Sequence, residues 1–207
     1  YRAADEEVTS TRGRANMLRQ SMSGDLPDDP TSDEFVDEVL DLCIGCKGCA
    51  RDCPSEVDMA KLKAEVVHER HQEEGASFRD RLFANVDALA KLGSATAPVS
   101  NLLSELPGAR AVLEKTVGIA SERTLPTFER ETLQDWFDAR GGSTVSAADA
   151  ERKAVLFPDT YTNYAHPEIG RAAVEVLEAA DVHVDLADRT DSGRPAHSKG
   201  FLDAARE

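Results

Sequence analysis

The pattern of apolar residues predicts three helices in the first third of the chain. The first is expected to run from an N-cap at Ser10 or Thr11 to Gly24, because hydroxyl side chains cap helix starts and glycine ends helices. The third is expected from an N-cap at Asp58 to about Gly75. The apolar stripe of the second helix consists of Phe35, Val36, Val39 and Leu40, and that of the third consists of Met59, Leu62, Val66 and Val67.

The second of these helices follows an acidic segment and leads into a cysteine. Residues 25–33 contain two prolines and four aspartates and are expected to form a loop, at the end of which Ser32 or Asp33 caps the helix. The helix then delivers the chain to Cys43. The cysteine-rich loop that starts there is therefore expected to lie between two helices.

The period of the apolar residues changes towards the end of the chain. Residues 77–142 are expected to be helical throughout, with prolines between the helices, and the run 141–148 has the composition of a linker. Short apolar runs at 153–157 and 182–186 are typical of buried strands, and a helix that begins at Pro167 lies between them. Strand, helix and strand in this order predict a right-handed parallel crossover, the start of an α/β layer.

The charge of the chain narrows the range of partners. Acidic residues outnumber basic residues by 39 to 24, which gives a formal net charge of −15. Such a surface repels nucleic acid and anionic membranes. The carboxylates are spread along the whole chain, as in proteins adapted to a salt-rich cytoplasm. No apolar run reaches the ~20 residues of a membrane-spanning helix and no signal peptide is recognisable, so a cytoplasmic location is expected.

The four cysteines, Cys43, Cys46, Cys49 and Cys53, lie within eleven positions. Their spacing of two, two and three residues, followed by Pro54, matches the ligand run of bacterial-type ferredoxins. Two-residue gaps let successive thiolates point inward from one tight loop, as a 4Fe-4S cluster requires. Gly45 and Gly48 are expected to relieve crowding and to leave N–H groups free for hydrogen bonds to sulfur, while Lys47 and Arg51 add positive charge.

Two questions about this loop stay open at the level of the sequence. In two-cluster proteins of this type, the first three cysteines bind one cluster and the fourth binds the other. Cys53 therefore either completes a single cluster or shares in a second one whose other ligands lie upstream of Tyr1. The alternative metal is zinc, which also accepts four thiolates and would make this a structural interaction domain. Zinc ribbons normally use two separated Cys-x-x-Cys pairs, whereas this run is contiguous.

Histidine and arginine residues outside the loop give weaker signals. His68 and His71 lie three residues apart on the third helix, but without a His-Glu-x-x-His pattern they are expected to be solvated surface residues. Arg12 and Arg14 form a small basic spot, expected either to dock a flavin-bearing domain or stabilise a reduced cluster, or to be a solvated helix start. The sequence shows no nucleotide-binding or nucleophile motif, so no catalytic residue is predicted.

Several motifs together resemble the iron-sulfur portion of FAD-linked 2-hydroxyacid dehydrogenases. This family includes D-lactate dehydrogenases, the glycolate oxidase iron-sulfur subunit and the anaerobic glycerol-3-phosphate dehydrogenase iron-sulfur subunit. The matching pieces span nearly the whole chain and are residues 10–16, the cysteine run with 57–59 and 63–65, 157–164, 193–195 and 198–202. The chain is most similar to a haloarchaeal-like version in which a flavin domain precedes the cluster domain.

The resemblance implies a route for electrons. FAD in an upstream domain or partner subunit would oxidise a lactate- or glycolate-type acid, and the 4Fe-4S cluster on the four cysteines would relay electrons to a quinone or similar acceptor. The chain would then be an electron-transfer component, not catalytic on its own, that is cytoplasmic or peripheral at the inner membrane face. It departs from the family at Thr160 and at 191–193, where related subunits carry cysteines. No redox role is therefore expected for the α/β segment.

The expected fold class is mainly α. An α-helical ferredoxin-like domain is expected at 1–80, a helical connector at 81–142 and the start of an α/β module of the cysteine-rich type at 150–207. The first residue is Tyr1 and the last residues read as an unfinished helix, so we expect a piece of a longer polypeptide. The alternative is a complete, stand-alone ferredoxin-like carrier.

Overall fold

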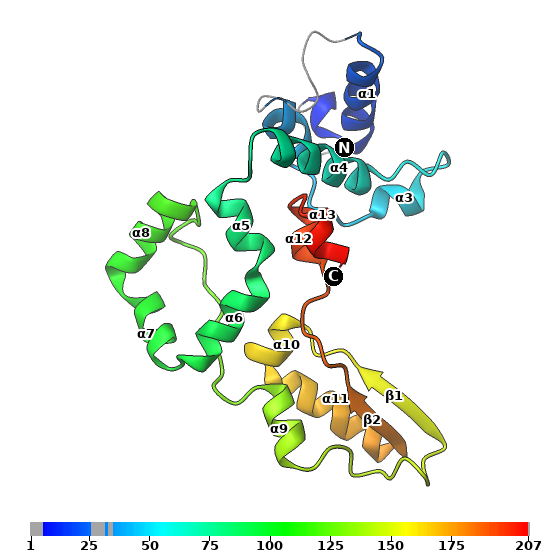
Figure 1. Ribbon diagram of the computed structural model, residues 1–207, viewed down its shortest axis with the longest axis vertical. Coiled ribbons are helices and arrows are strands. Elements are labelled where there is room, and N and C mark those ends of the chain that lie inside the picture. Colours follow the sequence, from blue (N-terminus) through cyan, green and yellow to red (C-terminus); the bar gives the residue numbers. More distant parts are fainter. Residues whose placement is uncertain (1–5, 26–31, 33–34, 207) are drawn as a thin grey trace. The chain divides into compact units, whose positions relative to one another are not determined.

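The computed structural model describes residues 6–25, 32 and 35–206. It is mainly helical with one small parallel sheet, which confirms the predicted fold class (Figure 1). The chain divides into two compact units, of which the first comprises residues 1–84 and 193–207 and the second residues 85–192. The domain boundaries predicted from the sequence stay a prediction.

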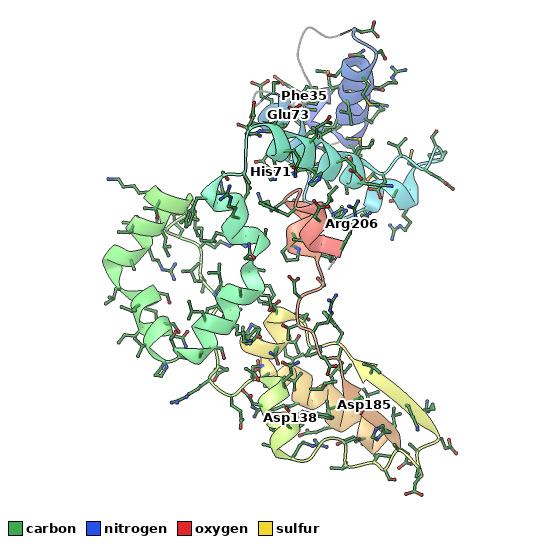
Figure 2. All side chains as sticks on the ribbon, viewed as in Figure 1. Phe35, His71, Glu73, Asp138, Asp185 and Arg206 are labelled. Carbon is green, nitrogen blue, oxygen red and sulfur yellow. The ribbon has the colours of Figure 1, made fainter. Side chains whose placement is uncertain are left out.

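The first unit has an apolar core, to which its helices between residues 7 and 73 contribute. They are η1 (Glu7–Thr9), α1 (Thr11–Met22), the π-helix η2 (Val36–Leu40), α3 (Gly48–Asp52), α4 (Met59–Glu73), α5 (Phe78–Ala84), α12 (Arg194–Ser198) and α13 (Leu202–Arg206). The buried core residues are Leu18, Phe35, Val36, Val39, Leu40, Met59 and Val67. Phe35 is labelled in Figure 2. The predicted apolar stripe of the second helix is confirmed, although the helix has the wider π geometry.

Capping side chains confirm two predicted helix starts. Ser10 and Asp58 each accept a hydrogen bond of 3.0 Å from a backbone N–H group in the first turn of α1 and α4. The loop predicted at 25–33 and the candidate cap Asp33 lie mostly or wholly outside the described residues. Ser32 is described, and its hydroxyl oxygen accepts a hydrogen bond of 3.3 Å from the N–H group just before η2.

The buried face of α4 differs from the predicted stripe. Met59 and Val67 are buried as predicted, but Leu62 and Val66 are only partly buried and pack at the edge of the core. The positions that face inward carry Ala60, Lys63 and Ala64, with exposed fractions of 4%, 9% and 1%. Small side chains allow close packing there, and the aliphatic part of a lysine can be buried while its amino group finds a polar partner. The positions of the large apolar residues alone therefore do not identify the buried face of α4.

The C-terminal helices α12 and α13 belong to the first unit and pack on α4 and α5 (Figure 1). His68 Nδ1 lies 2.9 Å from the carbonyl oxygen of Gly200 and, since a carbonyl only accepts, donates to it. The ring of His71, labelled in Figure 2, lies 4.8 Å from that of Phe201. The prediction that both histidines are solvated surface residues was therefore wrong, because sequence spacing does not show which distant segment covers a helix.

Replacing Gly200 by alanine is expected to weaken this docking by about 2 kcal/mol. Gly200 has φ of +73°, and an added Cβ would lie 2.6 Å from Val67 Cγ1 and 2.9 Å from the backbone nitrogen of His68. Hydrogen exchange of α12 and α13 measures the effect. The matched control is Gly75→Ala, since Gly75 has φ of +85° but nothing within 4 Å of an added Cβ. Equal exchange in both variants would mean that the contact with α4 is not needed.

The second unit contains the parallel strands and the helices around them. Its elements are α6 (Val86–Ala95), α7 (Val99–Glu105), α8 (Pro107–Val117), α9 (Leu133–Ala139), β1 (Arg152–Leu156), α10 (Thr160–Tyr164), α11 (Pro167–Ala179) and β2 (Val182–Leu186). The strands pair in parallel, with Arg152 opposite Val182, and α11 connects them. The predicted strand, helix and strand are confirmed, but β1 has no buried residue, so the prediction of a buried strand was wrong for 153–157. Phe137, Val174 and Val184 form the buried centre between helices and sheet.

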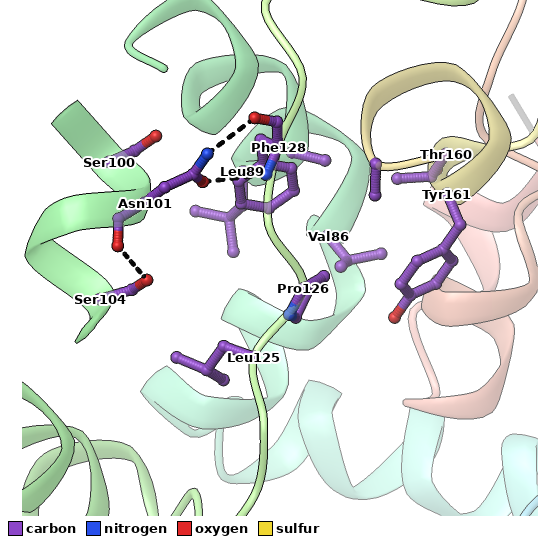
Figure 3. Close-up of a pocket in the computed structure, with 12 residues that line it drawn as sticks. Val86, Leu89, Ser100, Asn101, Ser104, Leu125, Pro126, Phe128, Thr160 and Tyr161 are labelled. Carbon is purple, nitrogen blue, oxygen red and sulfur yellow. Dashed lines mark hydrogen bonds between the residues drawn. The ribbon is translucent and has the colours of Figure 1, made fainter. Parts of the chain in front are cut away.

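One part of the predicted helical region is not helical. Residues 119–132 form no helix or strand, and Asn101 holds Phe128 by two hydrogen bonds of 2.9 Å, one to its carbonyl oxygen and one from its N–H group (Figure 3). The ring of Phe128 packs on α6 at Gly93, where an added Cβ would lie 2.4 Å from a ring carbon. The asparagine thus gives the N–H and C=O groups of Phe128 the partners that a helix would otherwise supply. An apolar cavity of about 190 Å³ lies between this segment, α6, α7 and α10.

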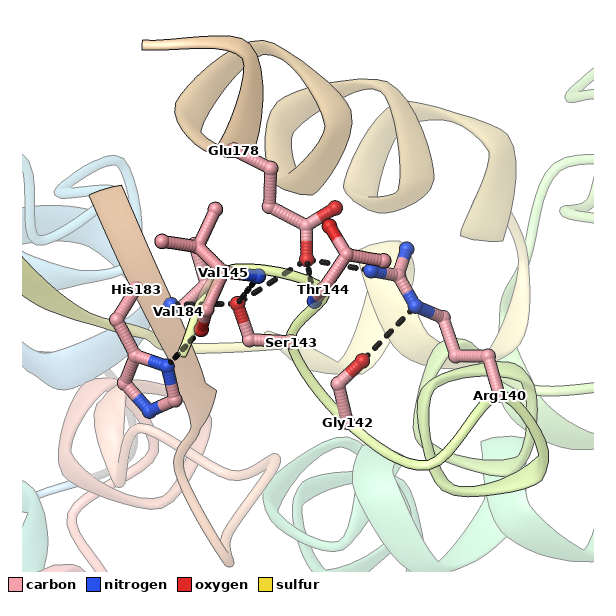
Figure 4. Close-up of polar contacts among 8 residues, drawn as sticks. All are labelled: Arg140, Gly142, Ser143, Thr144, Val145, Glu178, His183 and Val184. Atoms are coloured by element: carbon pink, nitrogen blue, oxygen red, sulfur yellow. Dashed lines mark hydrogen bonds and ion pairs between the residues drawn. The ribbon is translucent and has the colours of Figure 1, made fainter. Parts of the chain in front are cut away.

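The run predicted to be a linker is held against α11 by Glu178 (Figure 4). The carboxylate accepts hydrogen bonds from the guanidinium of Arg140, from the Ser143 hydroxyl at 3.1 Å and from the Thr144 N–H group at 2.8 Å. Burial on its own would raise the pKa of Glu178, but the hydrogen bonds from Arg140 and Thr144 outweigh it and lower the pKa from 4.5 to about 2. Residues 140–144 are therefore tied to the α/β layer.

Candidate metal centre

The cysteine loop runs from the end of η2 to the start of α4. The Cys43 N–H group donates to the carbonyl oxygen of Leu40 at 2.9 Å, so the first cysteine closes the preceding helix. Cys49 lies in α3, and Cys53 ends that helix with a hydrogen bond of 3.0 Å to the carbonyl oxygen of Cys49. The predicted placement of the loop between two helices is confirmed.

The four thiols differ in exposure and form no disulfide. Cys46 is exposed, while Cys43, Cys49 and Cys53 are partly buried, and Cys49 packs against the apolar core. Within the described ranges, no three side chains of Cys, His, Asp or Glu are close enough together to hold a metal ion. The structure therefore places the sulfurs along one loop and a short helix without gathering them around one point, and the ligand set stays a prediction.

The backbone of the loop fits a sulfur-rich cofactor. Gly45 and Lys47 have φ of +69° and +57°, which turns the chain sharply between the first three cysteines. Among the described residues, the N–H groups of 44–47 have no hydrogen-bond acceptor. Free N–H groups beside thiolates are the donors that hold and tune an iron-sulfur cluster. Donor chemistry and backbone thus agree with the group expected from the sequence.

The two cations predicted to act on the cluster are paired with carboxylates. Lys47 Nζ lies 2.9 Å from Asp58, and Arg51 Nε lies 2.9 Å from Asp52. Both side chains are well exposed, at 52% and 83%. Solvent and neighbouring carboxylates therefore screen most of their charge from the loop.

Sequence reasoning missed Lys63, a buried cation that contacts the backbone of the loop. Its Nζ donates a hydrogen bond of 2.9 Å to the carbonyl oxygen of Cys43. Burial lowers the pKa of Lys63, and the nearest carboxylate, Asp41, is 3.9 Å away. A signal was present, because Lys63 lies four residues after Met59 and four before Val67 on the same face of α4.

The basic spot at the start of α1 divides into two different environments. Arg12 is exposed and pairs with Glu7 at 2.7 Å, as expected of a solvated helix start. Arg14 is 8% exposed and one of its Nη atoms donates to the carbonyl oxygen of Thr9. The solvated interpretation is therefore right for Arg12 and wrong for Arg14.

The second unit offers no thiolate at the position singled out in the sequence. Thr160 begins α10, and its hydroxyl donates a hydrogen bond of 2.7 Å to Asp87. This hydroxyl also lies 3.4 Å from the carbonyl oxygen of Thr190. A hydroxyl in these contacts is a structural group that links α10 to α6.

None of the described helices combines the length and the apolar character needed to cross a membrane.

Comparison with known proteins identifies several relatives. The chain is 25% identical to D-2-hydroxyglutarate dehydrogenase of Haemophilus influenzae over 172 residues, which cover 81% of this chain and 17% of the relative. It is 29% identical to one subunit of the anaerobic glycerol-3-phosphate dehydrogenase of Escherichia coli over 176 residues, 84% of this chain and 43% of the relative. A probable glycolate oxidase iron-sulfur subunit of Bacillus subtilis is 32% identical over 77 residues, 37% of this chain and 16% of the relative.

The chain therefore spans less than half the length of these relatives. No family model matches it. No solved structure matches it either. The resemblance drawn from the sequence is nevertheless confirmed, since the homologues of this chain are two kinds of dehydrogenase and an iron-sulfur subunit, as expected of the iron-sulfur family of FAD-linked hydroxyacid dehydrogenases.

Proposed function

We propose that this chain is the electron-transfer portion of a flavin-dependent 2-hydroxyacid dehydrogenase and that its cysteine loop holds a 4Fe-4S cluster. The names of the relatives support an iron-sulfur subunit of a dehydrogenase. The observation that carries the proposal is the contiguous Cys-x-x-Cys-x-x-Cys-x-x-x-Cys-Pro run in a loop where the N–H groups of 44–47 have no acceptor among the described residues.

The residues that would hold the cluster are Cys43, Cys46, Cys49 and Cys53. When bound, such a cluster takes up and releases one electron at a time. The loop backbone would donate hydrogen bonds to its sulfurs, and the core helices η2 and α4 would fix the two ends of the loop. Cys49 and Cys53 are one helical turn apart, so both can serve one cluster, or Cys53 can serve a second one.

The proposed partners follow from the relatives. A flavin-containing dehydrogenase domain or subunit would supply electrons taken from a lactate- or glycolate-type acid, and a quinone or similar molecule would accept them. We place the site of action in the cytoplasm, at or near the inner membrane face. The chain itself would not transform the acid, since it carries no motif for binding a flavin or a nucleotide.

Anaerobic reconstitution with iron and sulfide tests the proposal. The protein is expected to bind iron and acid-labile sulfide and to show visible absorption that dithionite bleaches. Cys46→Ser is expected to lose most of this iron, because the exposed thiolate of Cys46 is a proposed ligand. Ile44→Ser is the matched control, since Ile44 lies in the same loop, is 81% exposed and has no ligand atom.

Two results would contradict the proposal. Colourless protein that holds stoichiometric zinc would instead support a structural zinc domain. Iron and sulfide that stay bound in a variant with all four cysteines replaced by serine would show that the loop is not their site.

A further inference from the structure

By whole-residue exposure, two charged residues in the described part of the chain are buried, and both are cations of the first unit. They are Arg14 and Lys63, at 8% and 9% exposure, and no buried carboxylate accompanies them there. This is unexpected in a chain with a formal net charge of −15. Burying a charge is costly unless a partner compensates it, so an isolated buried cation calls for an explanation.

Lys63 lies directly behind the cysteine loop. Its Nζ reaches the carbonyl oxygen of Cys43 at 2.9 Å, and this neutral group compensates only part of the charge. The carboxylate of Asp41 is 3.9 Å away, and its side chain is 71% exposed, so solvent weakens the attraction.

The other cations near the loop behave differently. Lys47 and Arg51 each contact a carboxylate at 2.9 Å, and both are exposed. By contrast, the nearby charges of Arg14 and Lys199 repel the ammonium group of Lys63. Lys199 is itself paired with Asp80 at 2.9 Å, so the charge left without a close carboxylate among the described residues is that of Lys63 and Arg14.

A net-negative group on the cysteine thiolates would supply the missing counter-charge. Cys43 is both the residue whose carbonyl Lys63 binds and the first proposed ligand. Uptake of one electron by the group adds one negative charge, and a fixed cation in a poorly solvated position stabilises that reduced form more than the oxidised form. The step moves one electron and no proton.

We propose that Lys63 is a positioning residue that fixes the Cys43 end of the loop and raises the reduction potential of the cluster bound there. This inference rests on the proposed function, because it requires a cluster on the cysteine loop. Lys47 and Arg51 lie within the cysteine loop, but they are paired with carboxylates and exposed. Their charges are therefore expected to shift the reduction potential less than that of Lys63.

Three variants of the whole chain test this inference after anaerobic reconstitution. Lys63→Met keeps the aliphatic stem and removes the charge, Lys63→Arg keeps the charge, and Lys61→Met removes an exposed lysine from the same helix. The readout is the cluster potential in a dye-mediated redox titration. Lys63→Met is expected to lower the reduced-to-oxidised ratio at a fixed potential at least tenfold, which corresponds to about 59 mV for one electron. Lys63→Arg is expected to recover most of the shift, and Lys61→Met to show none.

The iron and sulfide content of each variant separates failure of the inference from failure of the proposed function. A wild-type chain that binds no cluster overturns both. Full cluster content in Lys63→Met with the wild-type potential, or an equal shift in Lys61→Met, overturns the inference alone. If Lys63→Met loses its cluster, retention in Lys63→Arg supports the inference and equal loss in Lys63→Arg overturns it.

Discussion

Replacing Leu40 by alanine is expected to destabilise the first unit by about 2–5 kcal/mol, the usual cost of truncating a buried leucine. The Leu40 side chain is 0% exposed in the core formed by α1, η2 and α4. Its carbonyl oxygen also accepts the hydrogen bond from Cys43, so loosening this core should disturb the start of the cysteine loop. Urea unfolding followed by far-ultraviolet circular dichroism measures the loss of stability.

The matched control for this prediction is Leu42→Ala. Leu42 lies two positions further along the chain and is 58% exposed, so its truncation is expected to cost no more than about 0.5 kcal/mol. The chain has one tryptophan, Trp136 in α9 of the second unit, and its fluorescence reports on that unit separately. Equal effects of the two leucine variants would contradict the assignment of Leu40 to the core.

Replacing Glu178 by glutamine is expected to destabilise the second unit by about 3 kcal/mol, the free energy that corresponds to lowering a carboxyl pKa from 4.5 to about 2. The Glu178 side chain is 8% exposed, so solvent does little to screen its pairing with Arg140. The variant would also leave the guanidinium of Arg140 without its carboxylate. Urea unfolding followed by Trp136 fluorescence measures the effect, because α9 carries both Trp136 and the start of the anchored turn.

The same carboxylate predicts a pH dependence. Its pKa is lower in the folded state, so its contribution is complete above pH 4.5 and is lost as the pH falls towards about 2. Wild-type protein and Glu178→Gln should therefore differ at pH 7 and converge in strong acid. Glu175→Gln, an exposed position on the same helix, should follow the wild type throughout. A difference between wild type and Glu178→Gln that is constant from pH 7 to pH 2 would exclude this origin.

Local signals in the sequence were sufficient for much of the fold. The caps at Ser10 and Asp58 and the alternation around Val182 depend on neighbouring residues, and the structure contains the corresponding helices and strand. The prediction of a helix at 119–132 was wrong. The backbone partners of Phe128 come instead from Asn101 in α7, which is far from it in the sequence. The packing of the C-terminal segment on α4 likewise depends on contacts between residues far apart in the sequence, which the pattern of apolar residues does not reveal.

The candidate site could be predicted only in part. The cysteine spacing defined the loop because thiolates so close together in sequence have few other uses. The burial of the charged side chains around the loop could not be predicted in the same way. Lys47 and Lys63 are both lysines close to the cysteines in sequence, but Lys47 is exposed and Lys63 is buried. The burial of a lysine depends on which face of α4 turns inward, and small alanines rather than large apolar residues decide that face here.

The first unit is discontinuous in sequence, and this has a consequence for its synthesis. Residues 193–207 join a body whose other part, 1–84, leaves the ribosome first. The whole intervening unit, 85–192, must be translated before α12 and α13 can dock. Until then the surface of α4 that carries His68 and His71 is uncovered beside a nascent cysteine loop, so cofactor loading during translation and loading afterwards would encounter two different forms of the protein.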